Sequence, residues 1–260
     1  MCLIVFDWQP EQPHWLTLAA NRDEFRQRPA IPLACWEDNP RIIAGRDLEQ
    51  GGTWLGINRA GAFAAITNIR APGAGPAKPP SRGQLVADYL SAATDPGGYA
   101  RALSARARHY APFNLLVGDQ QALYYVSNYP QLRCEPVTPG IHSLSNAWLD
   151  TAWPKTTLAE QQLRQWQQQG GGSGSLAMLL GRQAPFADEL LPATGVPAEW
   201  ERLLSAQFII APGYGTRCST ALRGREQQLD IHEISWNEQG QPADIRRQQL
   251  ILAGKTAISS

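Results

Sequence analysis

The sequence predicts an α+β fold in which two antiparallel sheets carry helices on their outer faces. Short apolar runs separated by turn residues dominate residues 1–70, helical patterns follow, and the end of the chain returns to strands. This order of strands, helices, strands, helices and strands suits antiparallel sheets covered by helices better than the alternating strand–helix units of a parallel sheet. The chain shows no internal repeat and no linker, so we expect one domain over residues 1–260.

Five apolar or β-branched runs near the N-terminus predict strands. Gly, Pro, Asp and Asn punctuate these runs, as is typical of turns between strands. Gly51-Gly52-Thr53 is predicted as a turn, and Asn58-Arg59-Ala60-Gly61 as the turn of a hairpin. The first two runs are apolar enough to be covered on both faces, so we expect them to be antiparallel neighbours inside a sheet. The five predicted strands are Leu3–Phe6, Leu16–Ala20, Arg41–Ala44, Trp54–Ile57 and Ala62–Thr67.

A helix is predicted to follow the proline- and glycine-rich loop Ala71–Pro80. Ser81 is the expected N-cap of this helix, because Gln84 lies three residues further on, as in a capping box. The apolar positions of the helix repeat at helical spacing, which predicts one buried face. That face consists of Leu85, Val86, Tyr89 and Leu90.

The rest of the chain continues the pattern. Thr156–Gln169 is predicted as an amphipathic helix, and the run Gly170–Gly174 after it as a flexible connector. The glycine run is not a phosphate-binding loop, because no strand precedes it and no P-loop lysine follows it. The remaining predicted elements are helices at Gly97–Ala107 and Leu176–Leu180 and strands at Asn114–Gly118, Leu123–Ser127, Thr216–Leu222, Leu229–Ser235 and Gln248–Ala253.

Composition excludes several classes of function. Lysine plus arginine equals aspartate plus glutamate at 23 each, and no basic run occurs, so we expect no nucleic-acid partner. No apolar stretch approaches the ~18 residues that a membrane span needs, so we expect no membrane insertion. The apolar start of the chain is too short for a signal peptide, and the expected location is the cytoplasm.

The four cysteines are scattered, without the spacing of a zinc or haem-attachment motif. Cys35, Cys134 and Cys218 are therefore predicted to be unpaired, buried thiols. Cys2 differs because it follows Met1. Removal of Met1 would leave Cys2 with a thiol and a free α-amine, and an amine with a pKa near 8 is a suitable base for the thiol proton. The alternative is that Cys2 only packs within the first strand.

Several short motifs occur together in one order along the chain. They are Asn21-Arg22-Asp23-Glu24, Ala44-Gly45-Arg46-Asp47, Gly51-Gly52-Thr53-Trp54-Leu55-Gly56-Ile57-Asn58, Ser81-Arg82-Gly83, Phe113-Asn114-Leu115-Leu116, Ser143-Leu144-Ser145-Asn146, Trp153-Pro154-Lys155 and Tyr214-Gly215-Thr216-Arg217. This series resembles the NRDE family, also called the Transport and Golgi organisation 2 group.

That family is similar in turn to N-terminal-nucleophile hydrolases that cleave linear amides, and the likeness implies a four-layer αββα sandwich. By position, Cys2 resembles the nucleophile, Asp23 the carboxylate that orients the α-amine, and Asn68 a donor to the oxyanion. Asn146 and Arg217 resemble the remaining polar pair. The resemblance implies that these five residues line one concave site. Once Met1 is removed, the ammonium group of Cys2 and the nearby Arg217 are expected to lower the pKa of the Cys2 thiol.

Arg22 departs from the hydrolase pattern, in which an arginine stands three residues before the aspartate. Arg22 and Asp23 are adjacent, so on an extended strand they would face opposite sides. Either a β-bulge re-aims one of them, or Arg22 pairs structurally, for example with Glu24. Asn146 and Arg217 have structural alternatives as well, in turn formation and in a salt bridge at a sheet edge.

Three functions remain open on the sequence alone. The first is a cysteine amidohydrolase that acts on a small amide and needs no cofactor. The second is a haem-binding or haem-trafficking protein that uses the same pocket through tryptophans and arginines. The third is a scaffold with a vestigial pocket. The only histidines are His14, His109, His142 and His232, and each is expected to be an ordinary surface or core residue.

Overall fold

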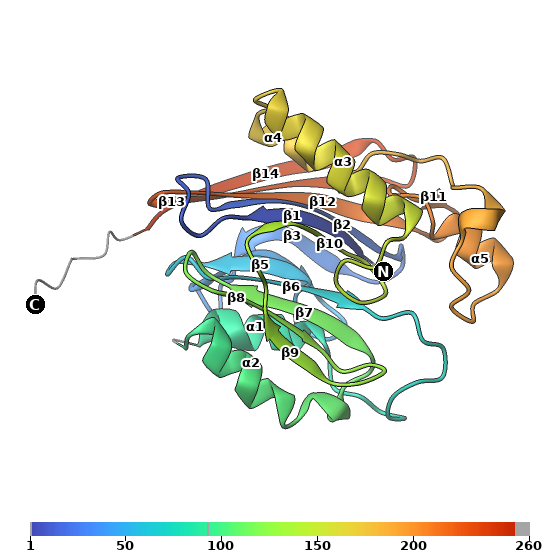
Figure 1. Cartoon of the computed structure of the whole chain (residues 1–260), viewed down its shortest axis with the longest axis horizontal. Helices are drawn as coiled ribbons and strands as arrows, with labels where there is room; N and C mark the ends of the chain where they lie inside the picture. Colours follow the sequence, from blue (N-terminus) through green and yellow to red (C-terminus); the bar gives the residue numbers. More distant parts are fainter. Residues whose placement is uncertain (1, 93, 253–260) are drawn as a thin grey trace, which may run out of the picture.

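Two antiparallel sheets lie face to face at the centre of the molecule (Figure 1). The computed structural model describes residues 2–92 and 94–252. The first sheet has the strand order β10 (Gly140–Leu144), β1 (Cys2–Trp8), β2 (Leu16–Phe25), β12 (Tyr214–Arg225), β13 (Gln228–Trp236) and β14 (Pro242–Ile251), with β11 (Ile210–Ala211) paired to β12. The second sheet has the order β3 (Ala30–Cys35), β4 (Ile42–Asp47), β5 (Leu55–Asn58), β6 (Phe63–Asn68), β7 (Phe113–Gly118), β8 (Leu123–Ser127) and β9 (Arg133–Pro136).

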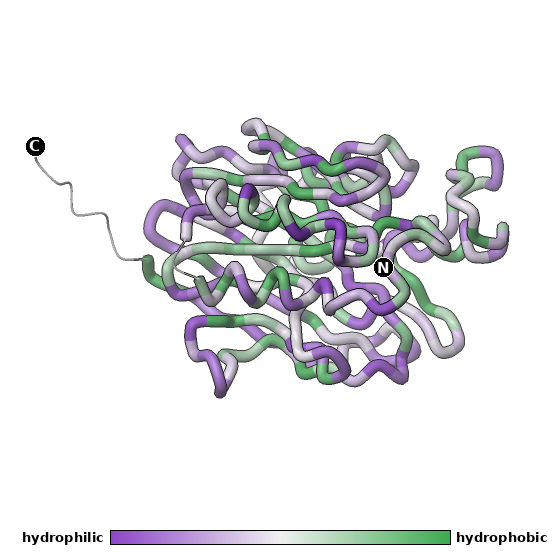
Figure 2. The backbone as a smooth tube through the Cα atoms, turned by 90° about the horizontal axis from the view of Figure 1, so that it is seen from below, coloured by the Kyte–Doolittle hydropathy of each residue, from purple (hydrophilic) through white to green (hydrophobic). Residues whose placement is uncertain are grey.

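The alternation of side chains along β1 shows why this strand must be covered on both faces. Ile4 and Phe6 point into the core between the two sheets, where they meet Ile57 and Phe63 of the second sheet. Leu3 points to the other face, where it packs in a cluster with residues of the helix above. Figure 2 agrees with this layering, since long hydrophobic stretches run through the interior and many peripheral loops are hydrophilic.

Helices cover the outer face of each sheet (Figure 1). On the first sheet lie α3 (Pro154–Gln168) and α4 (Ser173–Ala177), and on the second lie α1 (Gly83–Ser91) and α2 (Pro96–Ser104). The predicted αββα sandwich is therefore confirmed. The shorter helices are η1 (Ala107–His109), η2 (Asp188–Leu190) and α5 (Ala198–Leu203).

The prediction for the first two strands is also confirmed. β1 and β2 pair antiparallel, with Cys2 opposite Arg22 and Phe6 opposite Leu18. Both strands have a neighbour on each side, β10 and β12, so neither lies at an edge. Of the residues described, no helix is long and apolar enough to cross a membrane.

The sequence failed to indicate four strands: β3, β9, β10 and β11. β3 is an edge strand that contains Pro32, and its pairing with β4 shifts between Ile31 and Ala34. An edge strand has no neighbouring strand on one side, so a proline, which lacks the N–H group, is tolerated there. The alternation of apolar and polar residues that predicts a strand is lost at the same place. β9 and the first part of β10 are half-exposed or exposed, so they lack the apolar signal that predicts a strand.

Three details at element ends differ from the predictions. The N-cap of α1 is Arg82 and not Ser81. Arg82 has a helical backbone (φ −65°, ψ −33°), and its side chain forms no capping hydrogen bond. The helix α4 begins at Ser173, inside the run that was predicted to be a connector. The strand predicted at Gln248–Ala253 is part of β14, which ends at Ile251. Ala253 and Met1 lie outside the described residues.

Candidate functional site

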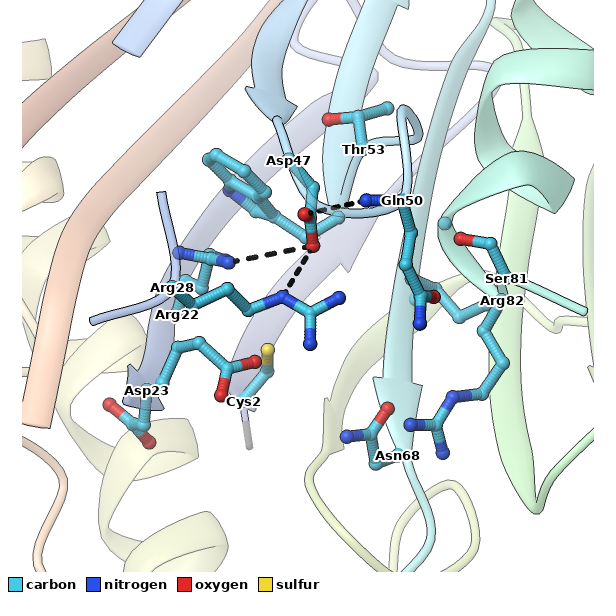
Figure 3. Close-up of a pocket in the computed structure, with 14 residues that line it drawn as sticks. Cys2, Arg22, Asp23, Arg28, Asp47, Gln50, Thr53, Asn68, Ser81 and Arg82 are labelled. Carbon is cyan, nitrogen blue, oxygen red and sulfur yellow. Dashed lines mark hydrogen bonds and ion pairs between the residues drawn. The ribbon is translucent and has the colours of Figure 1, made fainter. Parts of the chain in front are cut away.

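A polar cavity of about 90 Å³ opens where the ends of β1, β2 and β6 come together with the start of α1. It lies at one end of the two sheets, so side chains from both sheets reach it (Figure 3). The residues that line it include Cys2, Arg22, Asp23, Glu24, Arg28, Asp47, Asn68, Ser81 and Arg82.

Cys2 is the first residue of β1 and is directly paired with Arg22 of β2. Directly paired residues point to the same face, so both side chains lie on the inner side of the first sheet. Burial raises the pKa of the Cys2 thiol and Asp23 adds to this rise, while Arg22 opposes it. The lowering expected once Met1 has been removed stays a prediction, and loss of water around the buried thiol acts against it.

The tetrapeptide Asn21-Arg22-Asp23-Glu24 distributes its side chains by strand alternation. Asn21 faces outward, where its Nδ2 donates to the carbonyl oxygens of Leu180 and Gln207 at 2.9 and 2.8 Å. Arg22 faces inward, and its guanidinium lies 4.2 Å from the centre of the Trp54 ring. Arg22 and Asp23 both reach the cavity, because it opens at the end of the strand.

The β-bulge considered for the Arg22–Asp23 step lies on the partner strand. β12 pairs Thr216 with Asp23 and Cys218 with Arg22, so Arg217 is the extra residue between them. The bulge redirects Arg217 away from the cavity. Its Nη1 donates to the carbonyl oxygens of Phe25, Arg26 and Arg28 at 2.9, 3.2 and 3.0 Å, respectively. Arg217 thus organises the loop after β2, and it is not among the described residues that line the cavity.

Asp23 is almost completely buried, and Thr216 holds its orientation. The Thr216 hydroxyl accepts a hydrogen bond from the Ile209 N–H at 2.9 Å and donates to Asp23 Oδ1 at 2.7 Å. Burial raises the pKa of the Asp23 carboxyl, and the neighbouring Lys155 is among the groups that oppose the rise. Asp23 follows Arg22, the direct partner of Cys2, so this carboxyl lies on β2 next to the start of β1.

Lys155 is a buried cation that the sequence did not single out as a site residue, although it lies in the quoted Trp153-Pro154-Lys155 motif. Its Nζ donates to the Leu204 carbonyl at 2.9 Å and lies 5.9 Å from the Trp153 ring centre. Burial lowers its pKa from 10.5 to about 8, with Arg70 adding to this effect and Asp23 and Cys2 opposing it. Lys155 is thus a buried positive charge that acts on the Asp23 carboxyl.

We predict that Lys155 makes stability depend on pH between 8 and 10.5. In this window the unfolded lysine binds a proton that the folded lysine has lost, so the free energy of unfolding rises with pH. Relative to a Lys155→Met variant, the wild type should gain up to ~3 kcal/mol across the window. Urea unfolding of both proteins at several pH values measures this difference. Parallel pH profiles for the two proteins would contradict the prediction.

Asn68 and Asn146 are connected directly, at the ends of strands from different sheets. Asn146 Nδ2 donates to the Asn68 carbonyl at 2.9 Å, and Ser145 Oγ donates to the Cys2 carbonyl at 3.0 Å. The Ser145 carbonyl in turn accepts from Thr67 Oγ1 at 2.6 Å. The pair Ser145–Asn146 therefore joins the start of β1 to the last residue of β6 and sets the spacing between Cys2 and Asn68.

A buried polar network supports this junction from the second sheet. Asn114 donates through Nδ2 to Thr67 Oγ1 at 3.1 Å and to the Ala147 carbonyl at 2.7 Å. Tyr125 donates its hydroxyl proton to Asn114 Oδ1 at 2.7 Å. Such a network loses its orientation if one member is left without a partner. The asparagine of the Phe113-Asn114 motif is accordingly structural, and it rigidifies the segment that carries Asn146.

Two glycine motifs meet at the wall of the cavity opposite Cys2. The Thr53 N–H donates to the Gly83 carbonyl at 3.1 Å, and a β-carbon at Gly52 would lie 2.3 Å from the Gly83 carbonyl carbon. Only glycine permits this approach. The contact places Ser81 and Arg82 at the cavity, and the Ser81-Arg82-Gly83 motif was the signal in the sequence that pointed to them.

The other cysteines and the histidines lie elsewhere. Cys35 is exposed, Cys134 is half-buried and Cys218 is buried, so the prediction of buried thiols is wrong for Cys35. The four histidines are not among the described residues that line the cavity, and both ring nitrogens of His142 are engaged, by Asp150 and the Thr138 carbonyl. Within the described part of the chain, no group of three or more His, Cys, Asp or Glu side chains is placed to hold a metal ion.

This chain is similar to solved structures and to curated relatives. A Caenorhabditis elegans N-acylethanolamine-hydrolyzing acid amidase ortholog matches the structure with a TM-score of 0.49 and 10% identity, over 85% of this chain and 92% of that chain. Curated relatives include the Transport and Golgi organization protein 2 homologs of Bos taurus and Homo sapiens, which are 33% and 32% identical over 245 residues. Each alignment covers 85% of this chain and 88% of the relative. The family model described as Transport and Golgi organisation 2 matches residues 1–238, and the chain belongs to this family.

Proposed function

We propose that this protein is an N-terminal cysteine amidohydrolase that cleaves a linear amide C–N bond in a small molecule. Cys2 is the nucleophile once Met1 has been removed. The observation that best supports the proposal is the placement of Cys2 and Asn68 in one polar cavity, at strand ends that Ser145 and Asn146 hold together.

The proposed reaction needs only groups of this chain and one water molecule. The α-amine of Cys2 takes the thiol proton, and the thiolate attacks the amide carbon to form a tetrahedral intermediate. Asn68 donates to the oxyanion, which such donors stabilise by about 3–4 kcal/mol. The C–N bond then breaks, the leaving amine receives the proton, and water hydrolyses the thioester to release the acid.

The raised pKa of Cys2 fits a mechanism with a dedicated base. A buried thiol with a raised pKa is protonated at neutral pH, so it becomes a nucleophile only if a nearby group accepts its proton. In the proposal this group is the α-amine, and Asp23, oriented by Thr216, holds the resulting ammonium.

We predict that iodoacetamide alkylates Cys2 faster in the processed protein than in a protein with a blocked N-terminus. The comparison form carries a Gly-Ser extension before Cys2, which removes the α-amine from this residue. Both forms carry Cys35→Ser and Cys134→Ser, because these two thiols are exposed or half-buried. Loss of a general base costs about 10²–10⁴-fold, and we expect labelling of Cys2 to fall by at least about tenfold.

Mass spectrometry measures both parts of this experiment. The intact mass reports whether Met1 is removed, and peptide masses report the rate at which Cys2 is labelled. Cys218 is buried and serves as the internal control that should stay unlabelled in both forms. A retained Met1, or equal labelling of Cys2 in the two forms, would rule out the proposed nucleophile.

Haem carriage in the same cavity is the second candidate, and the cytoplasm is the location we propose for either function. The observation that favours haem is the set of arginines at the cavity, which are suitable partners for propionate groups. The cavity of about 90 Å³ is smaller than the ~300 Å³ of typical ligand pockets, so haem would require an opening of the site. This candidate would be supported over hydrolysis if the Soret band of added haem shifts with the wild-type protein but not with Arg22→Leu.

A further inference from the structure

Three arginines converge on the cavity that holds Cys2. Arg22 and Arg28 reach it from the side of the first sheet, and Arg82 reaches it from the start of α1 on the opposite wall (Figure 3). A nucleophile that attacks a neutral amide does not by itself require three guanidinium groups. Their presence therefore points to a property of the substrate.

The carboxylates of the cavity are already engaged. Asp47 Oδ2 accepts from Arg28 Nε at 2.7 Å and lies 4.0 Å from Arg22 Nη2, while its Oδ1 accepts from the backbone N–H groups of Glu49 and Gln50 at 2.9 and 3.2 Å. Asp47 is thus shared by two arginines, and Arg28 Nη1 also lies 3.6 Å from Oε1 of Glu49.

The other two carboxylates of the lining face different partners. Asp23 accepts from Thr216 and has Lys155 as a neighbouring cation. Glu24 Oε1 accepts from the backbone N–H of Phe25 at 2.9 Å. The formal charges of the lining balance, and Glu24 is the carboxylate whose charge acts most strongly on Arg82, although the two form no ion pair within 4.0 Å.

Arg82 has unused capacity for hydrogen bonding. Its Nη1 donates to the Pro112 carbonyl at 3.0 Å, and within the described residues it forms no ion pair within 4.0 Å. A guanidinium has five N–H donors, and an oxyanion such as a carboxylate accepts two of them side by side. Burial also lowers the pKa of Arg82, which Glu24 opposes and Arg28 reinforces, so a second anion would be stabilised there.

We propose that the substrate of Cys2 is an amide that carries a small anionic group, most simply a carboxylate, which Arg82 holds with help from Arg28. This inference rests on the proposed function, since it assigns a substrate class to the same site. The cavity of about 90 Å³ is small, so an anion bound by Arg82 also places a neighbouring carbonyl near Cys2 and Asn68. Binding energy from the anion then serves to position the amide for attack.

Two alkylating agents that differ in charge test the proposal. Iodoacetate and iodoacetamide react in the same way: the thiolate forms a C–S bond, the C–I bond breaks and iodide leaves. We expect the ratio of the iodoacetate rate to the iodoacetamide rate at Cys2 to exceed that of N-acetylcysteine amide by about tenfold or more, because a cationic cavity concentrates anions. The proteins carry Cys35→Ser and Cys134→Ser as before, at constant ionic strength.

Variants separate charge from folding. Arg82→Gln should bring the ratio down towards that of the small thiol, and Arg82→Lys, which keeps the charge, should retain most of the preference. Arg108 is exposed on η1 and does not line the cavity, so Arg108→Gln is the matched control and should keep the wild-type ratio. Acetate and inorganic phosphate are then tested separately as competitors of iodoacetate, with acetamide as the neutral control. The anion that slows the labelling more is the one that the site prefers.

The two possible failures are distinguishable. Rapid labelling by iodoacetamide together with a ratio no higher than that of the small thiol would overturn the anionic substrate but leave Cys2 as the nucleophile. An unchanged ratio in Arg82→Gln, or no protection by either anion, would overturn it as well. Slow labelling of Cys2 by both reagents would reject the proposed function and this inference together.

Discussion

Asn68→Ala is expected to slow the acylation of Cys2 by 4-nitrophenyl acetate by about 10²–10³-fold, because one donor to the oxyanion is lost. The ester forms a tetrahedral oxyanion when the thiolate attacks it, and the release of 4-nitrophenolate measures the rate. Asn68 lies across the cavity from Cys2, and its backbone carbonyl is fixed by Asn146. Its side-chain amide is therefore held on a rigid strand end.

Alkylation provides the control for this prediction. Iodoacetamide forms no oxyanion, so its reaction with Cys2 should change far less in Asn68→Ala than the reaction with the ester does. Asn39→Ala, a change at a surface turn outside the cavity, should leave both rates unchanged. Equal losses in both reactions would mean that Asn68 acts only on the structure of the site.

Glu201→Leu is expected to destabilise the protein by about 3–5 kcal/mol, because it leaves a buried arginine unpaired. Arg70, just after β6, forms an ion pair with Glu201 of α5, and their side chains are only 4% and 7% exposed. Glu201 also accepts from the N–H and the hydroxyl of Thr194, at 2.7 and 2.5 Å. Burial lowers the pKa of Arg70 and Glu201 opposes this effect, so Glu201 offsets part of the cost of burying this charge.

The double variant Arg70→Met/Glu201→Leu distinguishes the loss of a pair from the loss of packing. Removing both charges should recover most of the lost stability, since apolar replacements of a buried pair are often neutral. The exposed pair Arg202–Asp188 is the matched control, and Asp188→Asn should leave the urea midpoint almost unchanged. A double variant as unstable as Glu201→Leu would show that the ion pair is not the origin of the effect.

The layered fold was predictable because its evidence is local. Leu3–Phe6 and Leu16–Ala20 are continuous apolar runs, and only strands covered on both faces tolerate such runs. The helical spacing of Leu85, Val86, Tyr89 and Leu90 likewise defined the buried face of α1. Edge elements such as β3 and β9 escaped prediction because half-exposed strands carry no continuous apolar signal.

The candidate site was predictable only in part. The placement of Cys2, Arg22, Asp23 and Asn68 in one cavity agrees with the family resemblance. Arg217 of β12 instead binds the loop after β2, and Asn146 donates to the backbone of Asn68. Their roles in the reaction stay predictions.

The two sheets with their helical cover follow from local sequence patterns, and the motifs identify the family. Which polar groups meet depends on how distant segments pack together. Strand alternation gives the face of a side chain, but one extra residue at the bulge of β12 turns Arg217 away from the cavity. Lys155, Arg28 and Arg82 come from separate elements, and only the packing of those elements brings their long side chains to Asp23 and Cys2. Burial, which raises the pKa of the thiol despite the nearby arginine, is likewise a property of the folded assembly and of no single segment.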